Sequence, residues 1–455
     1  MSKNCDGRGI RMNNHYTKED VINLTNEQNV LFIRLQFLDT LGMPKNIVIP
    51  SNRIEDALTE GIPFDGSSIV GYATIEESDK IAKPNPNSYV ILPETLEKRK
   101  TARLICDIYE PDESRSPADT KYVLERVMEK AENHGFTFNT GPECEFFLFK
   151  KDGEKSTLIP NDSAGYFDLS HRDLAEGVRA DISLALEEVG IQLHTSHHEV
   201  SDGQHEINFK YDNAITTAEN VVTLKYITKI IANKHNLHAS FMPKPIFGLN
   251  GSGMHTHMSF LNRDGENIFY DENNEHKLSD IATSFIAGLL KFIKEITCIL
   301  NPTVNSYKRL VPGYEAPTYI SWANRNRSAL IRIPTGTKNG ARCELRSPDL
   351  SGNPYLQFAV MLAAGLYGVE HNLVLQDPIE KNIYQLSDSE KEKYNIDRLP
   401  ESLGHAIAIM EESSFVKEIL GEHIYENYIH VKKNQWGDYR KQVTPWEINK
   451  YLSLI

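Results

Sequence analysis

The stretch GPECEFF at residues 141–147 places two carboxylates, Glu143 and Glu145, two positions apart in a predicted β-strand. Side chains alternate between the two faces of a strand, so both carboxylates should point the same way. The same face continues as Phe147 and Phe149, and aromatic side chains of this size favour burial. An isolated E-x-E pair is usually the solvated face of a strand. Carboxylates buried beside aromatic rings, however, need a partner such as a cation.

Four further candidate ligands are embedded in otherwise apolar sequence. Glu199 and Glu206 flank a short turn in HHEVSDGQHEI, His255 follows a glycine-rich stretch in NGSGMHTH, and Glu344 lies in RCELR. Taken singly, the turn is typical of a surface hairpin, and a lone histidine is usually a hydrogen-bonded structural group. Five carboxylates and one imidazole that converge would instead hold hard divalent cations such as Mg²⁺ or Mn²⁺, which occur where phosphoryl groups are handled.

A cationic cluster lies near the last of these ligands. Six basic side chains fall within residues 325–346: Arg325, Arg327, Arg332, Lys338, Arg342 and Arg346. Forked guanidinium groups at this density favour the binding of several phosphate oxygens. The preceding stretch NSYKRLVPGYEAP, at 305–317, contains prolines and a glycine that predict an ordered loop of the kind that closes over substrates.

The composition indicates a globular protein of two or more domains, because 455 residues with 40% hydrophobic side chains are enough for a large core. A net charge of −14 disfavours nucleic acid and anionic membranes as partners. The sequence shows neither a signal peptide nor a membrane span, and its five cysteines are scattered singly without a CxxC pair. We therefore expect a cytoplasmic protein with no disulfide framework and no zinc site.

The hydrophobic pattern predicts an α+β protein in three parts. We expect a disordered tail over residues 1–15, a small domain over 16–118 and a larger domain over 119–455, with PDESRSPAD at 111–119 as the linker. The small domain should contain strands at 30–38, 45–50, 88–92 and 101–109 and a helix at 52–61. The large domain should contain helices near 119–134, 171–189, 214–236 and 279–300, strands near 255–261, 328–334 and 341–346, and helices after 353.

Read in order, the motifs resemble those of glutamine synthetase, type I. The series is FDGSSI at 64–69, GPECEFF, the HHEV…GQHEI hairpin, NGSGMHTH, NSYKRLVPGYEAP, NRSALIRIP at 326–334 and RCELRSPD at 342–349, and its spacing matches from about residue 16 onward. There is no GxxxxGK[ST] phosphate loop, so metals and arginines would handle the phosphates.

The resemblance implies a fold, a reaction and an assembly. The fold would be a small N-terminal β-grasp domain and a larger catalytic domain with a curved antiparallel sheet flanked by helices. The reaction would be ATP-dependent ligation of ammonia to L-glutamate through γ-glutamyl phosphate, as in nitrogen assimilation, with two or three Mg²⁺ or Mn²⁺ ions per site. The assembly would be a homododecamer of two hexameric rings, with active sites between neighbouring subunits.

The resemblance also implies roles for individual residues. One metal would be held by Glu145, Glu199 and Glu206, and a second by Glu143, His255 and Glu344. Glutamate would contact Asn250, Gly251, His255, Arg309 and Arg346. ATP would contact His257, Ser259, Arg327, Arg332, Lys338 and Arg342. The catalytic residues would be Arg327, Asp65, an ammonium-binding carboxylate donated by the adjacent subunit, and Glu315, a flap residue that shields the phosphorylated intermediate from water.

Four positions depart from the family pattern or bear on regulation. Ser201 and Asp202 stand where the family usually has Ala-Pro, which adds a carboxylate close to the predicted metals. Thr74 stands where Gram-positive-type enzymes carry an arginine linked to glutamine feedback. Tyr384 aligns with the tyrosine that is adenylylated in another bacterial subtype, but the chain length favours the non-adenylylated alpha subtype, so we do not expect its modification. Regulatory proteins, glutamine and 2-oxoglutarate stay open as effectors.

Two other functions compete with this interpretation. A γ-glutamyl ligase acting on a polyamine or another amine is disfavoured, because both ammonium-site carboxylates, Asp65 and Glu315, are present. A catalytically silent relative that serves as a binding protein is disfavoured as well, because no predicted ligand or flap residue is lost.

Overall fold

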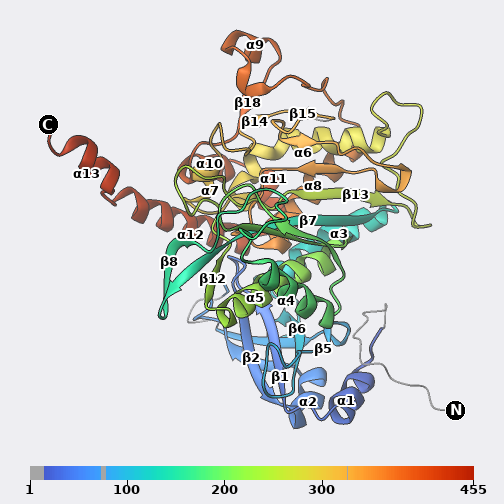
Figure 1. The fold of residues 1–455 in the computed structure, drawn as a ribbon. Helices are drawn as coiled ribbons and strands as arrows, with labels where there is room; N and C mark the ends of the chain where they lie inside the picture. The colour runs from blue at the N-terminus through green and yellow to red at the C-terminus, as the bar shows by residue number, and fades with distance from the viewer. Residues whose placement is uncertain (1–14, 73–77, 325) are drawn as a thin grey trace.

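The computed structural model describes residues 15–72, 78–324 and 326–455. Thr74, Arg325 and all but the last residue of the predicted disordered tail therefore lie outside the described residues. Figure 1 shows a small domain built around one sheet, a larger domain built around a second sheet, and a C-terminal helix that extends away from the body of the molecule.

The small domain is a mixed sheet with helices packed against it. Within the described residues the strand order is β2-β1-β6-β4-β3, with β5 paired to β6, and β1 runs parallel to β6. The strands are β1 (Phe32–Leu38), β2 (Pro44–Pro50), β3 (Ile62–Asp65), β4 (Asp79–Pro84), β5 (Val90–Ile91) and β6 (Thr101–Tyr109), and the helices are α1 (Lys18–Glu27) and α2 (Ile54–Thr59).

Local sequence explains both the start of α1 and the orientation of β1. Thr17 and Asp20 form a reciprocal capping box, which satisfies backbone N–H groups that the first turn of α1 leaves free. In β1, Ile33 and Leu35 are fully buried in the core of the small domain, as the alternation of side chains along a strand requires.

The large domain is organised around β7 (Thr137–Asp152), which pairs with strands on both sides along its length. The strand order is β15-β16-β17-β13-β7-β10-β9, with β8, β11 and β12 also paired to β7. The other strands are β8 (Lys155–Pro160), β9 (Leu193–His198), β10 (Gln204–Phe209), β11 (Asp212–Asn213), β12 (Leu237–Ser240), β13 (Thr256–Leu261), β15 (Trp322–Ala323), β16 (Ile331–Arg332) and β17 (Cys343–Leu345), and a separate pair joins β14 (Tyr319–Ile320) to β18 (Asp397–Arg398).

Helices cover this sheet and complete the core. They are α3 (Thr120–Asn133), α4 (Glu176–Glu188), α5 (Ala214–Lys234), α6 (Asp280–Leu300), α7 (Ser306–Arg309), α8 (Pro354–Glu370), α9 (Asp388–Lys393), α10 (Leu403–Glu411), α11 (Ser414–Leu420), α12 (Glu422–Arg440) and α13 (Pro445–Tyr451). The face of β7 that carries Cys144, Phe146 and Leu148 is completely buried in the hydrophobic core, so the opposite face, with Glu143 and Glu145, is left for the site. The predicted α+β class is confirmed.

Several element boundaries were predicted wrongly. The helix expected from 171 begins at Glu176, because Asp173 binds the side chain of Arg179 and the backbone of Ala175, while the N–H of Leu174 binds Asp162. The strand expected at 328–334 is reduced to Ile331–Arg332, and that expected at 88–92 is a short 3-10 turn followed by Val90–Ile91. Among the described residues no helix is both long and apolar enough to cross a membrane.

Candidate active site

The register of β7 and β10 brings the first carboxylates together. Glu206 lies directly opposite Glu145, and Asn208 lies opposite Glu143, in an antiparallel pairing. Because paired residues present their side chains on the same face of a sheet, the two glutamates point into the same space. Gly203, at φ +66°, closes the turn before β10; a Cβ atom there would come 2.8 Å from the Cβ of Pro160. Turn geometry therefore requires glycine at this position.

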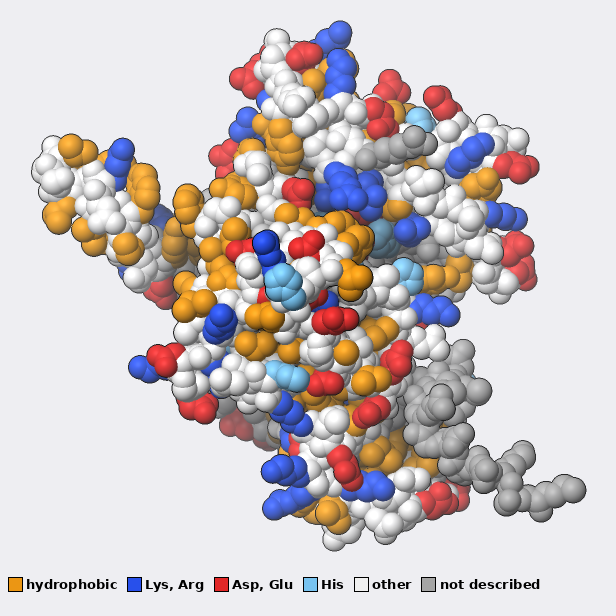
Figure 2. All heavy atoms as spheres, viewed as in Figure 1, with side chains coloured by type: hydrophobic (Ala, Val, Ile, Leu, Met, Phe, Trp, Pro, Cys, Tyr) orange, Lys and Arg blue, Asp and Glu red, His pale blue; other side chains and the backbone are white. Residues whose placement is uncertain are grey.

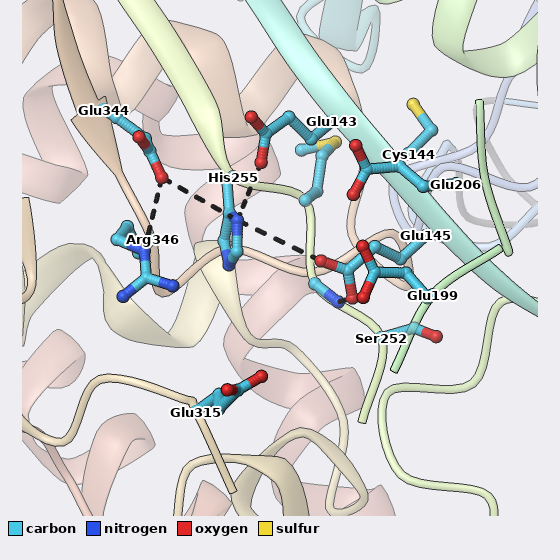
Figure 3. A network of polar contacts seen from close by, with 12 residues as sticks. Glu143, Cys144, Glu145, Glu199, Glu206, Ser252, His255, Glu315, Glu344 and Arg346 are labelled. Atoms are coloured by element: carbon cyan, nitrogen blue, oxygen red, sulfur yellow. Dashed lines mark hydrogen bonds and ion pairs between the residues drawn. The ribbon is translucent and has the colours of Figure 1, made fainter. Parts of the chain in front are cut away.

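On the other side of β7, β13 brings the remaining ligands to the same face. The strand pairs with both β7 and β17, so that His257 is opposite Gly141 on one side and Glu344 on the other. The Nδ1 atom of His255 lies 2.9 Å from Glu143, 3.8 Å from Glu344 and 4.0 Å from Glu145 (Figure 3). Two groups have their candidate donor atoms within 4.8 Å of one another: Glu143, His255 and Glu344, and His197, Glu199 and Glu206.

These side chains line a cavity of about 330 Å³. Its walls carry all five predicted carboxylate ligands and His255, and they also carry Asn250, Gly251, Arg309, Glu315, Arg327, Arg332 and Arg346. The cavity is also lined by residues for which no role was predicted: Tyr166, Val200, Gln204, Tyr314 and Ala316. Tyr166 is on a loop distant in sequence from every motif, so only the fold could place it here. Gln204 lies inside the HHEVSDGQHEI motif, and its position close to Glu206 is the sequence feature that could have predicted its place in the site.

The carboxylates repel one another in this partly buried space. Burial, together with the neighbouring charges of Glu145 and Glu206, raises the pKa of Glu199 to about 9. Burial also raises the pKa of Glu145, with repulsion from Glu206, although the charges of His255 and Arg309 oppose the shift. A cation among these oxygens would relieve the repulsion.

Glu143 has the opposite electrostatic environment. Burial disfavours its ionisation, but hydrogen bonds and charge from His255 and His257 lower its pKa below the ordinary value. The Nε2 atom of His257 lies 2.9 Å from Glu143, and its Nδ1 atom accepts a hydrogen bond from Arg342 at 3.2 Å. His257 therefore donates to Glu143 and accepts from Arg342, which fixes its tautomer. This chain of contacts leads from the carboxylates to the cationic cluster.

Arginines surround Glu344 and extend to the glycine-rich loop. Glu344 is 1% exposed and pairs with Arg332 Nε at 2.7 Å and with Arg346 Nε at 3.2 Å. Arg309 is also buried, and its guanidinium donates to the carbonyl oxygens of Ser347, at 2.7 Å, and Arg346, at 3.0 Å. The glycines of this loop make room for Arg309. A Cβ atom at Gly253 would overlap the Arg309 guanidinium, and one at Gly251 would overlap the Pro243 carbonyl oxygen and come 3.1 Å from the Arg309 side chain.

Comparison with known proteins agrees with this arrangement. Residues 29–111 match the family described as glutamine synthetase, beta-Grasp domain, and residues 117–451 match glutamine synthetase, catalytic domain. The chain is 52% identical to the glutamine synthetase of Clostridium saccharobutylicum over 439 residues, covering 96% of this chain and 99% of the relative. It is 49% identical to that of Thermus thermophilus over 443 residues, with the same coverage.

The chain belongs to the glutamine synthetase family. As a member of it, the protein is a glutamate–ammonia ligase that makes glutamine from glutamate and ammonia with ATP, and this confirms the predicted activity. The predicted β-grasp and catalytic folds are confirmed as well. A solved structure entitled "GmaS/ADP complex-Conformation 1" superimposes with a TM-score of 0.87 at 31% identity, covering 95% of this chain and 99% of that one. A glutamine synthetase of Plasmodium falciparum, 24% identical, shares the fold with a TM-score of 0.85 and covers 96% and 99% of the two chains.

Not every predicted site residue lies in the cavity of this chain. Asp65 ends β3 in the small domain, is exposed and does not line the cavity. Hydrogen bonds from the Ser67 side chain and from its backbone N–H, the latter at 2.8 Å, lower the pKa of the Asp65 carboxyl. Lys338 is exposed in a 3-10 turn outside the cavity. Ser259, along β13 beyond His257, is likewise not part of the wall. Asp202, expected near the metals, is exposed and does not line the cavity either, because the turn directs it outward.

Glu315, the predicted flap residue, enters the cavity from a separate loop (Figure 3). Its backbone φ is +56°, a value that residues other than glycine rarely adopt. Its carboxylate accepts a hydrogen bond from the Asn250 side chain at 3.0 Å. The following residue, Ala316, accepts a hydrogen bond from the Tyr384 hydroxyl at 2.5 Å. Contacts on both sides therefore hold Glu315 in this strained conformation.

Proposed function

We propose that this protein is a type I glutamine synthetase of the non-adenylylated alpha subtype, acting in the cytoplasm in nitrogen assimilation. The supporting observation is that Glu143, Glu145, Glu199, Glu206, His255 and Glu344 face one cavity beside four arginines. The γ-carboxylate of glutamate is a poor electrophile, and ATP carries dense negative charge. A site that binds both therefore needs cations and fixed guanidinium groups. Phosphorylation of the γ-carboxylate would give γ-glutamyl phosphate, and attack by ammonia on that acyl carbon would release phosphate.

The donor set fits two or three Mg²⁺ or Mn²⁺ ions. Carboxylate oxygens dominate the donor set, no cysteine is among the described residues that line the cavity, and the raised pKa of Glu199 supports the need for a cation beside it. Glu145, Glu199 and Glu206 would hold one ion, and Glu143, His255 and Glu344 a second. When bound, these ions would neutralise phosphate oxygens and polarise the transferred phosphoryl group.

The remaining residues would orient the substrates. Arg309, Arg346, Asn250, Gly251 and His255 would contact glutamate. His257, Ser259, Arg327, Arg332, Lys338 and Arg342 would contact ATP. Arg327 reaches the cavity from an exposed segment, so it is placed to stabilise the phosphoryl group as charge develops. Glu315 would exclude water from the acyl phosphate and bind ammonium.

We infer a homododecamer of two hexameric rings, with Asp65 donated across a subunit boundary. Asp65 is exposed and absent from its own cavity, so a neighbouring cavity is the place where it can act on ammonium. Helix α13 extends from the body, and the helix and the residue after it expose large apolar side chains, including 64% of Trp446 and 77% of Leu452 (Figures 1 and 2). Such surfaces are characteristic of subunit contacts. We also assign 16–118 to the β-grasp domain and 119–455 to the catalytic domain.

Adenylylation of Tyr384 is not part of this proposal. The side chain is partly buried, its hydroxyl is bound to the Ala316 carbonyl, and burial raises its pKa, so the nucleophilic form is disfavoured. Modification would require the flap contact to break.

A coupled assay tests the proposed function. Purified enzyme is given ATP, glutamate and Mg²⁺ or Mn²⁺, with ammonium, hydroxylamine, methylamine or a polyamine as acceptor, while phosphate and amide product are measured separately. Ammonium should support amide formation with a one-to-one ratio to phosphate, and polyamines should not. Glu206→Ala, which removes a proposed metal ligand, should be inactive, and Glu315→Ala should release phosphate in excess of glutamine.

Preference for a larger amine, or no amide product with either metal, would contradict the proposal. Full activity of Glu206→Ala would contradict the metal assignment alone.

A further inference from the structure

Ser201 lies in the turn between β9 and β10, between the two proposed ligands Glu199 and Glu206. The side chain is 5% exposed, so its hydroxyl is not available to bulk water. Its Oγ atom accepts a hydrogen bond from the backbone N–H of Asn250 at 2.9 Å. Asn250 is 49 positions further along the chain, in the glycine-rich loop that we assign to glutamate binding.

The contact continues from this loop to the flap. The Asn250 side-chain amide donates to the Glu315 carboxylate at 3.0 Å. Asn250 therefore binds Ser201 of the turn through its backbone and Glu315 of the flap through its side chain. Gln204, also in the turn region, donates to the Gly251 carbonyl at 3.1 Å and to Glu145 at 3.2 Å. The turn is therefore hydrogen-bonded to the loop at two adjacent residues, Asn250 and Gly251. Of these two contacts from the turn, the one from Ser201 binds Asn250 itself.

We propose that Ser201, which stands where the family usually has alanine, is a positioning residue particular to this chain that couples the predicted metal-binding turn to the glutamate loop and, through Asn250, to Glu315. This inference rests on the proposed roles of Asn250 and Glu315. Removing the hydroxyl leaves the backbone N–H of Asn250 without its acceptor. Asn250 is then held less firmly, and its side-chain amide no longer orients Glu315 as well. Water would then reach the γ-glutamyl phosphate, attack its acyl carbon and break the bond to the phosphate oxygen, which releases glutamate and inorganic phosphate. Glu199 and Glu206 keep their own positions, so metal affinity should stay the same.

Three variants of the full-length enzyme test the coupling. Ser201→Ala should raise the glutamate KM about three- to tenfold, the range expected for one lost hydrogen bond, and should release phosphate in excess of glutamine. Ser201→Thr keeps a hydroxyl and should restore both values. Ser321→Ala is the matched control, because Ser321 is 6% exposed and its hydroxyl has no hydrogen-bond partner. Mg²⁺ affinity and the unfolding temperature are measured for all three.

Unchanged glutamate KM and phosphate-to-glutamine ratio in Ser201→Ala would overturn the inference. So would a defect that Ser201→Thr shares, or one accompanied by an equal loss of Mg²⁺ affinity, since the residue would then act through folding of the turn. Glu315→Ala, assayed in parallel, separates the two claims. Excess phosphate from Glu315→Ala but not from Ser201→Ala refutes only the coupling. No excess from Glu315→Ala refutes the flap role, and the glutamate KM of Ser201→Ala then decides whether the turn positions Asn250.

Discussion

At the scale of single residues, Glu199 holds a proton that a metal ion must displace. Its pKa in the metal-free fold is about 9, against an ordinary value of 4.5, so the carboxyl is protonated at pH 7.5. Mg²⁺ binding at that pH should therefore release about one proton from this group. Apparent Mg²⁺ affinity should rise between pH 6.5 and 8.5, because the competing proton becomes easier to remove. Calorimetry in buffers of different ionisation enthalpy measures the protons released.

The same shift has a consequence for stability. Between pH 4.5 and about 9, Glu199 ionises in the unfolded chain but stays protonated in the folded protein, so the metal-free enzyme should lose stability as pH rises through this window. Mg²⁺ should restore it, and more so at higher pH. Asp202→Asn, which changes an exposed carboxylate on the same turn, serves as the control and should behave as wild type. Affinity independent of pH, with no proton release, would contradict the cluster described here.

At the scale of elements, strand alternation made part of the site predictable. The pattern of GPECEFF correctly predicted that Glu143 and Glu145 share a face, and the turn residues in HHEVSDGQHEI correctly predicted a hairpin. The sequence could not give the register that sets Glu206 opposite Glu145, because pairing between distant strands depends on the whole sheet. Strands β3, β4, β8 and β12 were missed, since they are short or carry charged and proline residues.

The loop that carries Glu315 depends on a tether from the Tyr384 segment. Tyr384→Phe removes the hydroxyl that donates to the Ala316 carbonyl and that also interacts with the Thr318 side chain. Loss of one such hydrogen bond costs about 0.5–1.5 kcal/mol, so Glu315 should leave its strained conformation more often. We expect phosphate release to exceed glutamine formation and the ammonium KM to rise by up to about tenfold, with the ATP KM unchanged. Parallel phosphate and glutamine assays give the ratio. A one-to-one ratio in Tyr384→Phe would show that the tether does not govern the flap.

At the scale of the whole molecule, α13 exposes apolar surface that the chain itself does not cover. Its helix starts with a capping box between Thr444 and Glu447, so it is an ordered element and not a frayed end. We expect removal of residues 444–455 to reduce the assembly to smaller oligomers. Light scattering coupled to size-exclusion chromatography measures the mass. Trp446→Ser should have the same effect more weakly, while Lys450→Ser, on the same helix, should not. An unchanged mass after truncation would assign α13 another role.

The exposed position of Asp65 allows the proposed assembly to be tested by complementation between two inactive variants. If each site combines one subunit's metal ligands with its neighbour's Asp65, then Asp65→Ala and Glu206→Ala each inactivate every site in a pure oligomer. In a randomly mixed oligomer, some sites join an intact cluster from an Asp65→Ala subunit to the intact Asp65 of a Glu206→Ala subunit. A one-to-one mixture, dissociated and reassembled, should therefore recover about one quarter of wild-type activity. If Asp65 acted within its own chain, every subunit would still be defective and the mixture would stay inactive. Wild-type enzyme taken through the same reassembly sets the scale, and mass measurements on both samples show that subunits have exchanged.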